Sequence, residues 1–168
     1  LLANHDLALT LMYQKDKRKK KEAARLFRQV LPAQETTLGK CYEDTLQTIG
    51  NLSSLLCEQG EHVEALPLQR QVLTRREANF GAEHHSTLTA ANNLAELLRH
   101  EGKYDAAEGL YRQAVDIWMR VHEGEEHPLV ATGMRNLARV LFQQKPVERS
   151  TNAPEHGMPP LHVTHSYG

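Results

Sequence analysis

Apolar residues recur at every third or fourth position through most of the chain, which is the period of an amphipathic α-helix. Over residues 86–121 the recurring apolar positions are Leu94, Leu97, Leu98, Tyr104, Ala107, Tyr111, Ala114 and Trp118. Gly102 separates the two halves of this stripe, and glycine readily takes the left-handed conformation that ends a helix. The pattern predicts two helices, over about 86–100 and 104–121, joined by a tight turn at Gly102.

Polar and proline residues mark where such helices begin. Ser86 and Thr87 are candidate N-caps, because their hydroxyl groups can accept a hydrogen bond from a free amide of the first turn. Pro67 and Pro128 stand early in predicted helices, where a missing backbone N–H costs least.

The helical pair recurs along the chain at a nearly fixed interval. Residues 51–56 match residues 93–98 at an offset of 42, and residues 136–141 continue the series at an offset of 43. Counting back by 42, residues 23–31 match residues 65–73. Each repeat is therefore a helical hairpin, with a first helix A and a second helix B. Stacked hairpins form an all-α solenoid, which is the fold class that we predict.

The repeats set the domain boundaries. They cover about 1–38, 39–80 and 81–122, with a partial repeat at 123–144, so that residues 1–144 form one repeat domain. The tail, residues 145–168, holds four of the seven prolines, and we expect it to be disordered or extended. Because the fourth repeat lacks a helix B, its apolar face stays uncovered unless the tail, a further repeat or a partner packs on it. That face comprises Leu137, Val140, Leu141 and Phe142, and the tail offers Met158 and Leu161.

Composition narrows the choice of partners and compartment. The 168 residues include 20 Lys+Arg and 21 Asp+Glu, a formal net charge of -1, so no global positive field favours nucleic acid or an acidic membrane. Cys41 and Cys57 cannot form a disulfide framework and lack the spacing of a zinc site, which fits a reducing compartment. No apolar run approaches the roughly 20 residues of a membrane span. Leu1–Asn4 has neither an initiator Met nor a signal layout, so we expect a cytoplasmic piece of a longer chain.

A basic run at residues 15–21, Lys-Asp-Lys-Arg-Lys-Lys-Lys, departs locally from this balance. Such a run can contact phosphates or act as a nuclear import signal. It aligns with the turn at 59–61, exposed turns gather charge for solubility, and no interleaved aromatic platform accompanies it. We favour a solvated turn and leave the other two interpretations open.

The motifs that would indicate catalysis or metal binding fail on spacing. His122 and His127 are five residues apart, whereas the zinc-protease helix needs histidines four apart. Tyr104, Tyr111 and Trp118 are seven apart and indicate a packing stripe against the fourth helix A rather than an aromatic cofactor box. No Gly-rich phosphate loop and no Ser-His-acid triad stands out. We expect no enzyme activity, no metal and no cofactor.

The spacing Leu94-Ala95-x-x-Leu98, followed by Ala107-x-x-x-Tyr111-x-x-Ala114, resembles the tetratricopeptide repeat signature, with the usual unit of about 34 residues lengthened by about eight. The lengthened unit is similar to kinesin light chain repeats in three features. These are a Glu-His-Pro linker at 126–128, an Asn-Asn-Leu-Ala stretch at 92–95 and a Gly-Lys-Tyr turn at 102–104. The resemblance covers about residues 5–144 and implies a right-handed α-α superhelix. Nephrocystin-like and many microbial signalling proteins carry similar repeats.

Three asparagines, Asn51, Asn93 and Asn136, recur at one position of helix A. Asparagine is unfavourable in the middle of a helix, but its amide both donates and accepts hydrogen bonds and can hold an extended peptide backbone. A helices mainly line the inner face of such a superhelix, and the resemblance implies that this position contacts bound peptide. Alternatively, each asparagine bonds to the neighbouring repeat and fixes the register of the stack.

Arginines lie near these asparagines. A guanidinium binds a carboxylate through two parallel hydrogen bonds, so arginines favour an acidic or aromatic-acidic linear motif as the ligand. The alternative for any one of them is a solvated surface arginine. The full set of candidate peptide-binding residues is Gln47, Asn51, Thr89, Asn92, Asn93, Arg99, Arg135, Asn136 and Arg139.

These observations favour a non-catalytic protein-protein interaction module that binds short linear peptide motifs in a concave groove, in the manner of a kinesin-light-chain-like cargo adaptor. Its partners would be proteins, including kinesin cargo or motor components, and not nucleic acid, membrane or a small-molecule substrate. The alternative is a structural or regulatory repeat segment that packs on other domains of a larger signalling protein of nucleotide-binding or nephrocystin-like type.

Overall fold

The computed structural model describes residues 2–121 and 128–144, and these residues form seven α-helices. The helices are α1 (Leu2–Met12), α2 (Lys17–Thr37), α3 (Glu43–Gln59), α4 (His62–Phe80), α5 (His85–His100), α6 (Tyr104–Val121) and α7 (Pro128–Gln143). Within these ranges, no helix is both long enough and apolar enough to cross a membrane.

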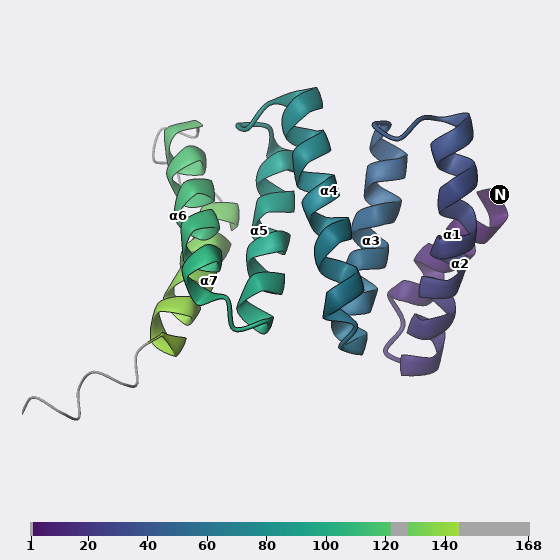
Figure 1. Cartoon of the computed structure of the whole chain (residues 1–168), viewed down its shortest axis with the longest axis horizontal. Helices are drawn as coiled ribbons and strands as arrows, with labels where there is room; N and C mark the ends of the chain where they lie inside the picture. Colours follow the sequence, from purple (N-terminus) through teal and green to yellow (C-terminus); the bar gives the residue numbers. More distant parts are fainter. Residues whose placement is uncertain (1, 122–127, 145–168) are drawn as a thin grey trace, which may run out of the picture.

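The helices pack in chain order, each against the next, and form one continuous row (Figure 1). Helices α1, α3, α5 and α7 are the A helices of the four repeats, and α2, α4 and α6 are the B helices of the first three. Contacts between α3 and α5, and between α5 and α7, join successive A helices directly. The expected all-α solenoid of helical hairpins is confirmed.

Glycines end the A helices of the second and third repeats as the sequence predicts. Gly60 and Gly102 have φ values of 82° and 72°, in the left-handed region that side chains with a Cβ resist. After α5, the amide of Lys103 donates to the carbonyl of Leu98 at 2.9 Å, which satisfies a carbonyl that the helix end would leave free. The predicted ranges 86–100 and 104–121 differ from α5 and α6 by one residue at most.

The first repeat differs from the others at its turn. The sequence favoured a turn at the basic run, residues 15–21, but α2 already begins at Lys17, three residues earlier than the register of α4 and α6 requires. The reason is Asp16, whose side-chain Oδ1 accepts from the amide of Arg18 at 2.8 Å and caps α2. The turn therefore lies at 13–16, and most of the basic run forms the first turns of a helix.

Two other helix-end predictions need correction. The N-cap of α5 is His84, whose ring Nδ1 accepts from the amide of Ser86 at 3.2 Å, and not Ser86 or Thr87. Pro67 lies inside α4, five residues after its start, so it falls just beyond the first turn. Pro128 begins α7 as predicted.

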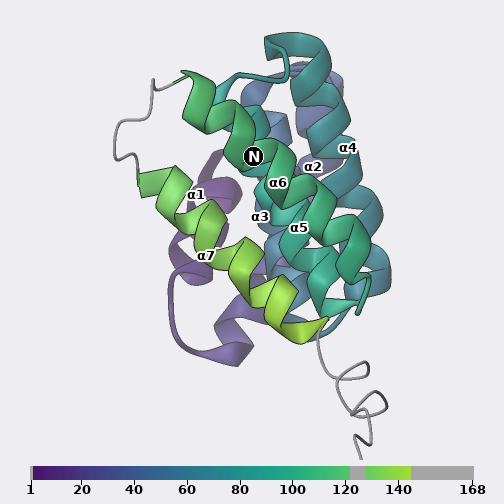
Figure 2. The same ribbon diagram turned by 90° about the vertical axis from the view of Figure 1, so that its left-hand side faces the viewer.

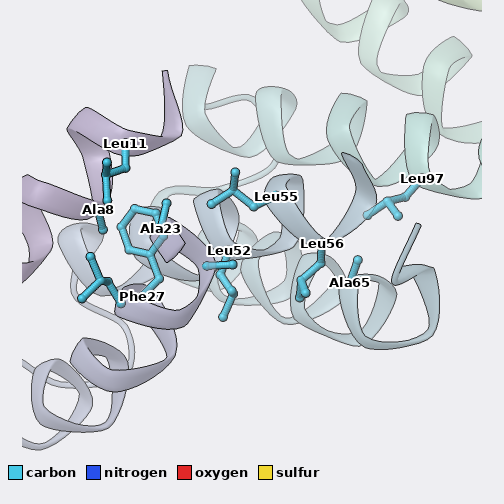
Figure 3. Close-up of a cluster of buried hydrophobic side chains, with 11 residues drawn as sticks. Ala8, Leu11, Ala23, Phe27, Leu52, Leu55, Leu56, Ala65 and Leu97 are labelled. Atoms are coloured by element: carbon cyan, nitrogen blue, oxygen red, sulfur yellow. The ribbon is translucent and has the colours of Figure 1, made fainter. Parts of the chain in front are cut away.

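Small and aliphatic side chains fill the interior. One cluster joins the first two hairpins to α5, and Figure 3 shows Phe27 and Ala23 of α2 beside Ala8 of α1 and Leu52 and Leu55 of α3. The position of Phe27 recurs in the later repeats as Gln69 and Tyr111, both at most 1% exposed. Further buried members of this cluster are Leu11, Ala24, Leu26, Leu56, Ala65 and Leu97.

The aromatic residues of α6 belong to the core, as predicted. Tyr111 is 0% exposed and Trp118 is 2% exposed, while Tyr104 is half-buried. Helix α7 approaches this part of α6 closely at Gly133. A Cβ at that position would lie 2.7 Å from Cγ2 of Val115 and 3.1 Å from Cζ3 of Trp118. The crossing of α6 and α7 therefore requires glycine in α7.

The apolar face of α7 is only partly exposed. Val140 is 0% exposed and packs with α5 and α6, so its predicted place on an uncovered face is wrong. Leu137 and Leu141 are half-buried, whereas Phe142 is 83% exposed and Met134 is 46% exposed. The tail at 145–168, with Met158 and Leu161, lies outside the described residues, as does the linker with His122 and His127.

Candidate peptide-binding face

Each A helix from the second repeat onward presents a polar stripe outside the core. The residues of these stripes are Gln47, Asn51 and Ser54 on α3, Thr89, Asn93 and Glu96 on α5, and Arg135 and Arg139 on α7. Spacings of three and four residues keep each stripe on one side of its helix. We call this set of eight residues the A-helix face. In Figure 2, which looks along the row of helices, α1 and α7 lie to the left and α4 lies to the right.

The recurring asparagines do not share one environment. Asn136 is 8% exposed, and its Nδ2 donates to Oδ1 of Asn92 in the preceding repeat at 3.2 Å. The residue that matches Asn92 one repeat earlier is Gly50, which has no amide side chain to offer Asn93. Asn93 is exposed, Asn51 is half-buried, and neither side chain forms a hydrogen bond to another described residue. Asn136 and Asn92 thus hold adjacent repeats in register, while Asn51 and Asn93 keep free amides.

A carboxylate that the sequence analysis did not single out, Glu96, contacts both Arg99 and Arg139. Glu96 Oε1 accepts from Arg99 Nη2 at 2.7 Å and Oε2 accepts from Arg99 Nε at 3.1 Å, a two-bond contact. Tyr111 of α6 donates its hydroxyl to Glu96 Oε2 at 2.8 Å. From α7, Arg139 Nη1 donates to Glu96 Oε1 at 3.3 Å. One carboxylate therefore joins α5, α6 and α7.

These contacts control the ionisation of Glu96. Burial on its own would raise the pKa of the carboxyl group, but hydrogen bonds from Arg99 and Tyr111 outweigh burial and lower the pKa from 4.5 to about 2. The same contacts raise the pKa of the Tyr111 hydroxyl, because burial and the adjacent carboxylate disfavour its anion. At neutral pH Glu96 is ionised and Tyr111 is a hydrogen-bond donor.

Arg99 and Arg139 share the carboxylate of Glu96, Arg135 stands one helical turn before Arg139 on α7, and the three arginines differ in their freedom to bind a ligand. Arg99 also donates through Nη1 to Gln143 at 3.1 Å, and its side chain is only 10% exposed. Arg139 makes contacts of 3.3 Å to Glu96 and to Asn136, and its side chain is 46% exposed. Arg135 is exposed and pairs with no other described residue. Arg135 and Arg139 are therefore open to a ligand, whereas Arg99 is occupied within the protein.

Gln47 and Thr89 differ in exposure and in hydrogen bonding. Gln47 is exposed and has no hydrogen-bond partner among the described residues. Thr89 is half-buried, and its hydroxyl donates to the carbonyl of His85 at 2.9 Å, which leaves its lone pairs free to accept.

A family model described as the tetratricopeptide repeat matches residues 44–120 and 86–146, which together are more than half of the chain. The chain belongs to the tetratricopeptide repeat family. Comparison with curated protein sequences gives no match.

Solved structures agree with this assignment of the tetratricopeptide repeat fold. A crystal structure of a kinesin light chain-type protein from Podosopora anserina, described as having nearly identical TPR-like repeats, is 26% identical with a TM-score of 0.74. The match covers 86% of this chain and 66% of that one. The structure of BtubC (BKLC) from P. vanneervenii is 18% identical with a TM-score of 0.69, and the match covers 75% of this chain and 50% of that one, which shows the shared fold. The chain thus spans less than two thirds of the length of these relatives.

The role of Glu96 in this tetratricopeptide repeat domain had a signal in the sequence. Glu96 stands three residues before Arg99 and one repeat before Arg139, and acid-base pairs at i and i+3 share a helix side. What the sequence does not show is the third contact, from Tyr111, because that contact depends on how α6 crosses α5.

The basic run lies at the opposite end of the row from this cluster. Lys20 Nζ contacts Glu58 Oε2 at 2.5 Å, and Lys15, Lys17 and Lys21 line an open pocket beside the same carboxylate. Lys15, Lys17 and Lys21 are exposed. This environment is compatible with the solvated interpretation. Among the described residues, no group of three or more His, Cys, Asp or Glu side chains could hold a metal ion.

Proposed function

We propose that this tetratricopeptide repeat domain binds short linear peptides with acidic and aromatic residues on its A-helix face and acts as a cargo-type adaptor without catalysis. The observation that carries the proposal is a pair of side-chain amides, Asn51 and Asn93, that bond to no other described residue and stand at matching positions on adjacent A helices. An extended peptide that crosses α3 and α5 can bond to both through its backbone.

Helix α7 supplies the features that select the side chains of the peptide. Arg135 is exposed and unpaired among the described residues, and Arg139 is half-exposed, so both can receive a ligand carboxylate. Met134 and Phe142, 46% and 83% exposed, offer apolar surface on the same helix for an aromatic residue. Acid and aromatic side chains in one ligand therefore fit one end of the A-helix face.

Similarity to kinesin light chain-type repeats supports an adaptor role that links protein partners, including cargo or motor components, in the cytoplasm. The Podosopora anserina protein is 26% identical, and this chain spans 66% of its length, so this step rests on likeness to part of that protein.

The test is peptide binding by matched variants. A library of ten-residue peptides containing Trp with Asp or Glu is screened against the protein, and the best peptide is titrated by calorimetry. We expect Asn93→Ala and Arg135→Ala each to weaken binding about fivefold or more, since a hydrogen bond to a neutral or charged group contributes about 0.5–3 kcal/mol. Gln29→Ala, an exposed position on α2, serves as the control and should change nothing. No binder tighter than millimolar, or equal effects of all three variants, contradicts the proposal.

One observation favours a second candidate function. Exposed Met134 and Phe142 leave apolar surface on the last described helix, where a further helix or domain can pack. In that case the repeats are a structural or regulatory segment of a larger signalling protein. Two results together would favour this function over the first: the parent protein binds no peptide, and Phe142→Ser loses binding to a neighbouring domain.

A further inference from the structure

Glu96 holds the place on the A-helix face that a ligand carboxylate would take. Both of its oxygens face the Nε and Nη2 atoms of Arg99 at 3.1 and 2.7 Å, which is the two-bond arrangement expected for an acidic peptide residue. We propose that Glu96 is a built-in competitor of the ligand's acidic residues and thereby determines the affinity and the acidic selectivity of the face. This inference rests on the proposed function.

The competition follows from the number of donors. Arg99 gives Nε and Nη2 to Glu96 and Nη1 to Gln143, so a second carboxylate finds no free two-bond contact there while Glu96 stays in place. Two carboxylates against one guanidinium also repel each other. A peptide carboxylate can therefore reach Arg99 only by displacing Glu96, and otherwise meets Arg135 and the more exposed Arg139.

The contacts of Glu96 are unequal, which decides what a ligand can displace. The bond to Arg139 is 3.3 Å, whereas Arg99 and Tyr111 hold the carboxylate at 2.7 and 2.8 Å. His100 Nε2 lies 3.3 Å from Glu96 Oε1, and Cys57 of α3 is a further titratable group that interacts electrostatically with Glu96. An incoming acid can take Arg139 at little cost, while Glu96 remains bound to Arg99 and lowers the local positive potential.

The hairpin itself does not need a carboxylate at this position. The matching residue of the second repeat is Ser54, and α3 packs on α4 without an acid there. In the fourth repeat the same position is Arg139. Glu96 is thus particular to the helix that faces the arginines of α7.

The test is the affinity of Glu96→Gln for an acidic peptide. Glutamine keeps the shape and still accepts from Tyr111, but it removes the charge that occupies Arg99 and Arg139. The probe is a ten-residue peptide with one Trp and four Asp, titrated beside its four-Asn counterpart. We expect Glu96→Gln to bind the Asp peptide about tenfold more tightly than the parent protein and the Asn peptide equally well, since one freed charge pair accounts for a change of this order.

Two matched variants keep the outcome interpretable. Glu101→Gln removes the same charge beyond the end of α5, outside the A-helix face, and should leave the affinity unchanged. Glu96→Ser, which copies Ser54 of the second repeat, covers the case in which Glu96→Gln fails to fold.

Equal or weaker binding by both Glu96 variants, while the parent protein binds the Asp peptide, overturns this inference alone. Absence of binding by the parent and by both Glu96 variants overturns the proposed function as well. An equal gain in Glu101→Gln means a general charge effect and also overturns the inference.

Discussion

At the scale of single residues, asparagine at the same repeat position has different bonding partners in different repeats. Asn136 bonds to Asn92, whereas the counterpart of Asn92 in the repeat before Asn93 is Gly50, and the side chain of Asn93 bonds to no other described residue. The recurrence of asparagine could be predicted from the sequence, because it needs only an alignment of repeats. Its partner could not, because the direct contact between successive A helices is set by how the hairpins stack.

Glu96 gives the first prediction, a dependence of stability on pH. Its pKa is lowered from 4.5 to about 2 in the folded protein, so its ionised contacts stabilise the fold above about pH 4.5 and are lost as the pH falls toward 2. A shift of one pKa unit corresponds to about 1.4 kcal/mol, and partial exposure reduces the effect here to about 2 kcal/mol in total. We expect the parent protein to lose more thermal stability between pH 5 and pH 2.5, as followed by circular dichroism, than Glu96→Gln. Parallel losses in the two proteins contradict this account.

Gly133 gives the second prediction. Alanine there gains up to about 1 kcal/mol in helix propensity but overpacks the crossing by about 1–3 kcal/mol, since neither the stiff Val115 nor the buried Trp118 ring can move freely. We expect Gly133→Ala to lower the free energy of unfolding in denaturant titrations. Gly109→Ala is the control, because a Cβ at that helical position meets nothing within 4 Å and should stabilise by about 1 kcal/mol. Stabilisation by both variants would mean that α7 does not need glycine.

At the scale of elements, the helical hairpins of the later repeats could be predicted almost to the residue, because their periodicity and their turn glycines agree. The first repeat could not be predicted as well. Its turn has no glycine, and the register of the other repeats placed the turn in the basic run at 15–21, whereas Asp16 caps α2 and the helix begins at Lys17. A single capping side chain, that of Asp16, determines where α2 begins, and an alignment of repeats takes no account of helix capping.

Asp16 gives the third prediction. Five basic residues occupy the first turns of α2, where the helix dipole disfavours positive charge, so the cap is the main group that stabilises this end. We expect Asp16→Ala to destabilise α2 by about 1 kcal/mol and to speed hydrogen exchange of the amides at 18–20. Asp116→Ala, on the exposed side of α6, is the control and should leave those amides unchanged. Unchanged exchange in Asp16→Ala would show that the cap does not hold this turn.

At the scale of the whole molecule, the solenoid places polar stripes from separate repeats side by side on the A helices. This arrangement could be predicted, because the repeats are in register over 51–56, 93–98 and 136–141. Which arginines are fully paired within the protein, and which stay open to a ligand, could not be predicted. The pairing of Arg99 with Glu96, three residues earlier on α5, follows from helix spacing, but the contact of Arg99 with Gln143 depends on how α7 packs against α5. In the proposed function, selection of acidic ligands therefore depends on Arg135 and Arg139.

The fourth prediction concerns where a peptide binds, and it is the most direct test of the central claim. An acidic-aromatic peptide is titrated into isotopically labelled protein, and backbone amide shifts are followed by NMR. We expect the largest shifts at Gln47, Asn51, Asn93 and Arg135 on α3, α5 and α7, because these residues have free polar groups on the A-helix face. Shifts confined to α2, α4 and α6, or no shifts at millimolar peptide, would contradict the account.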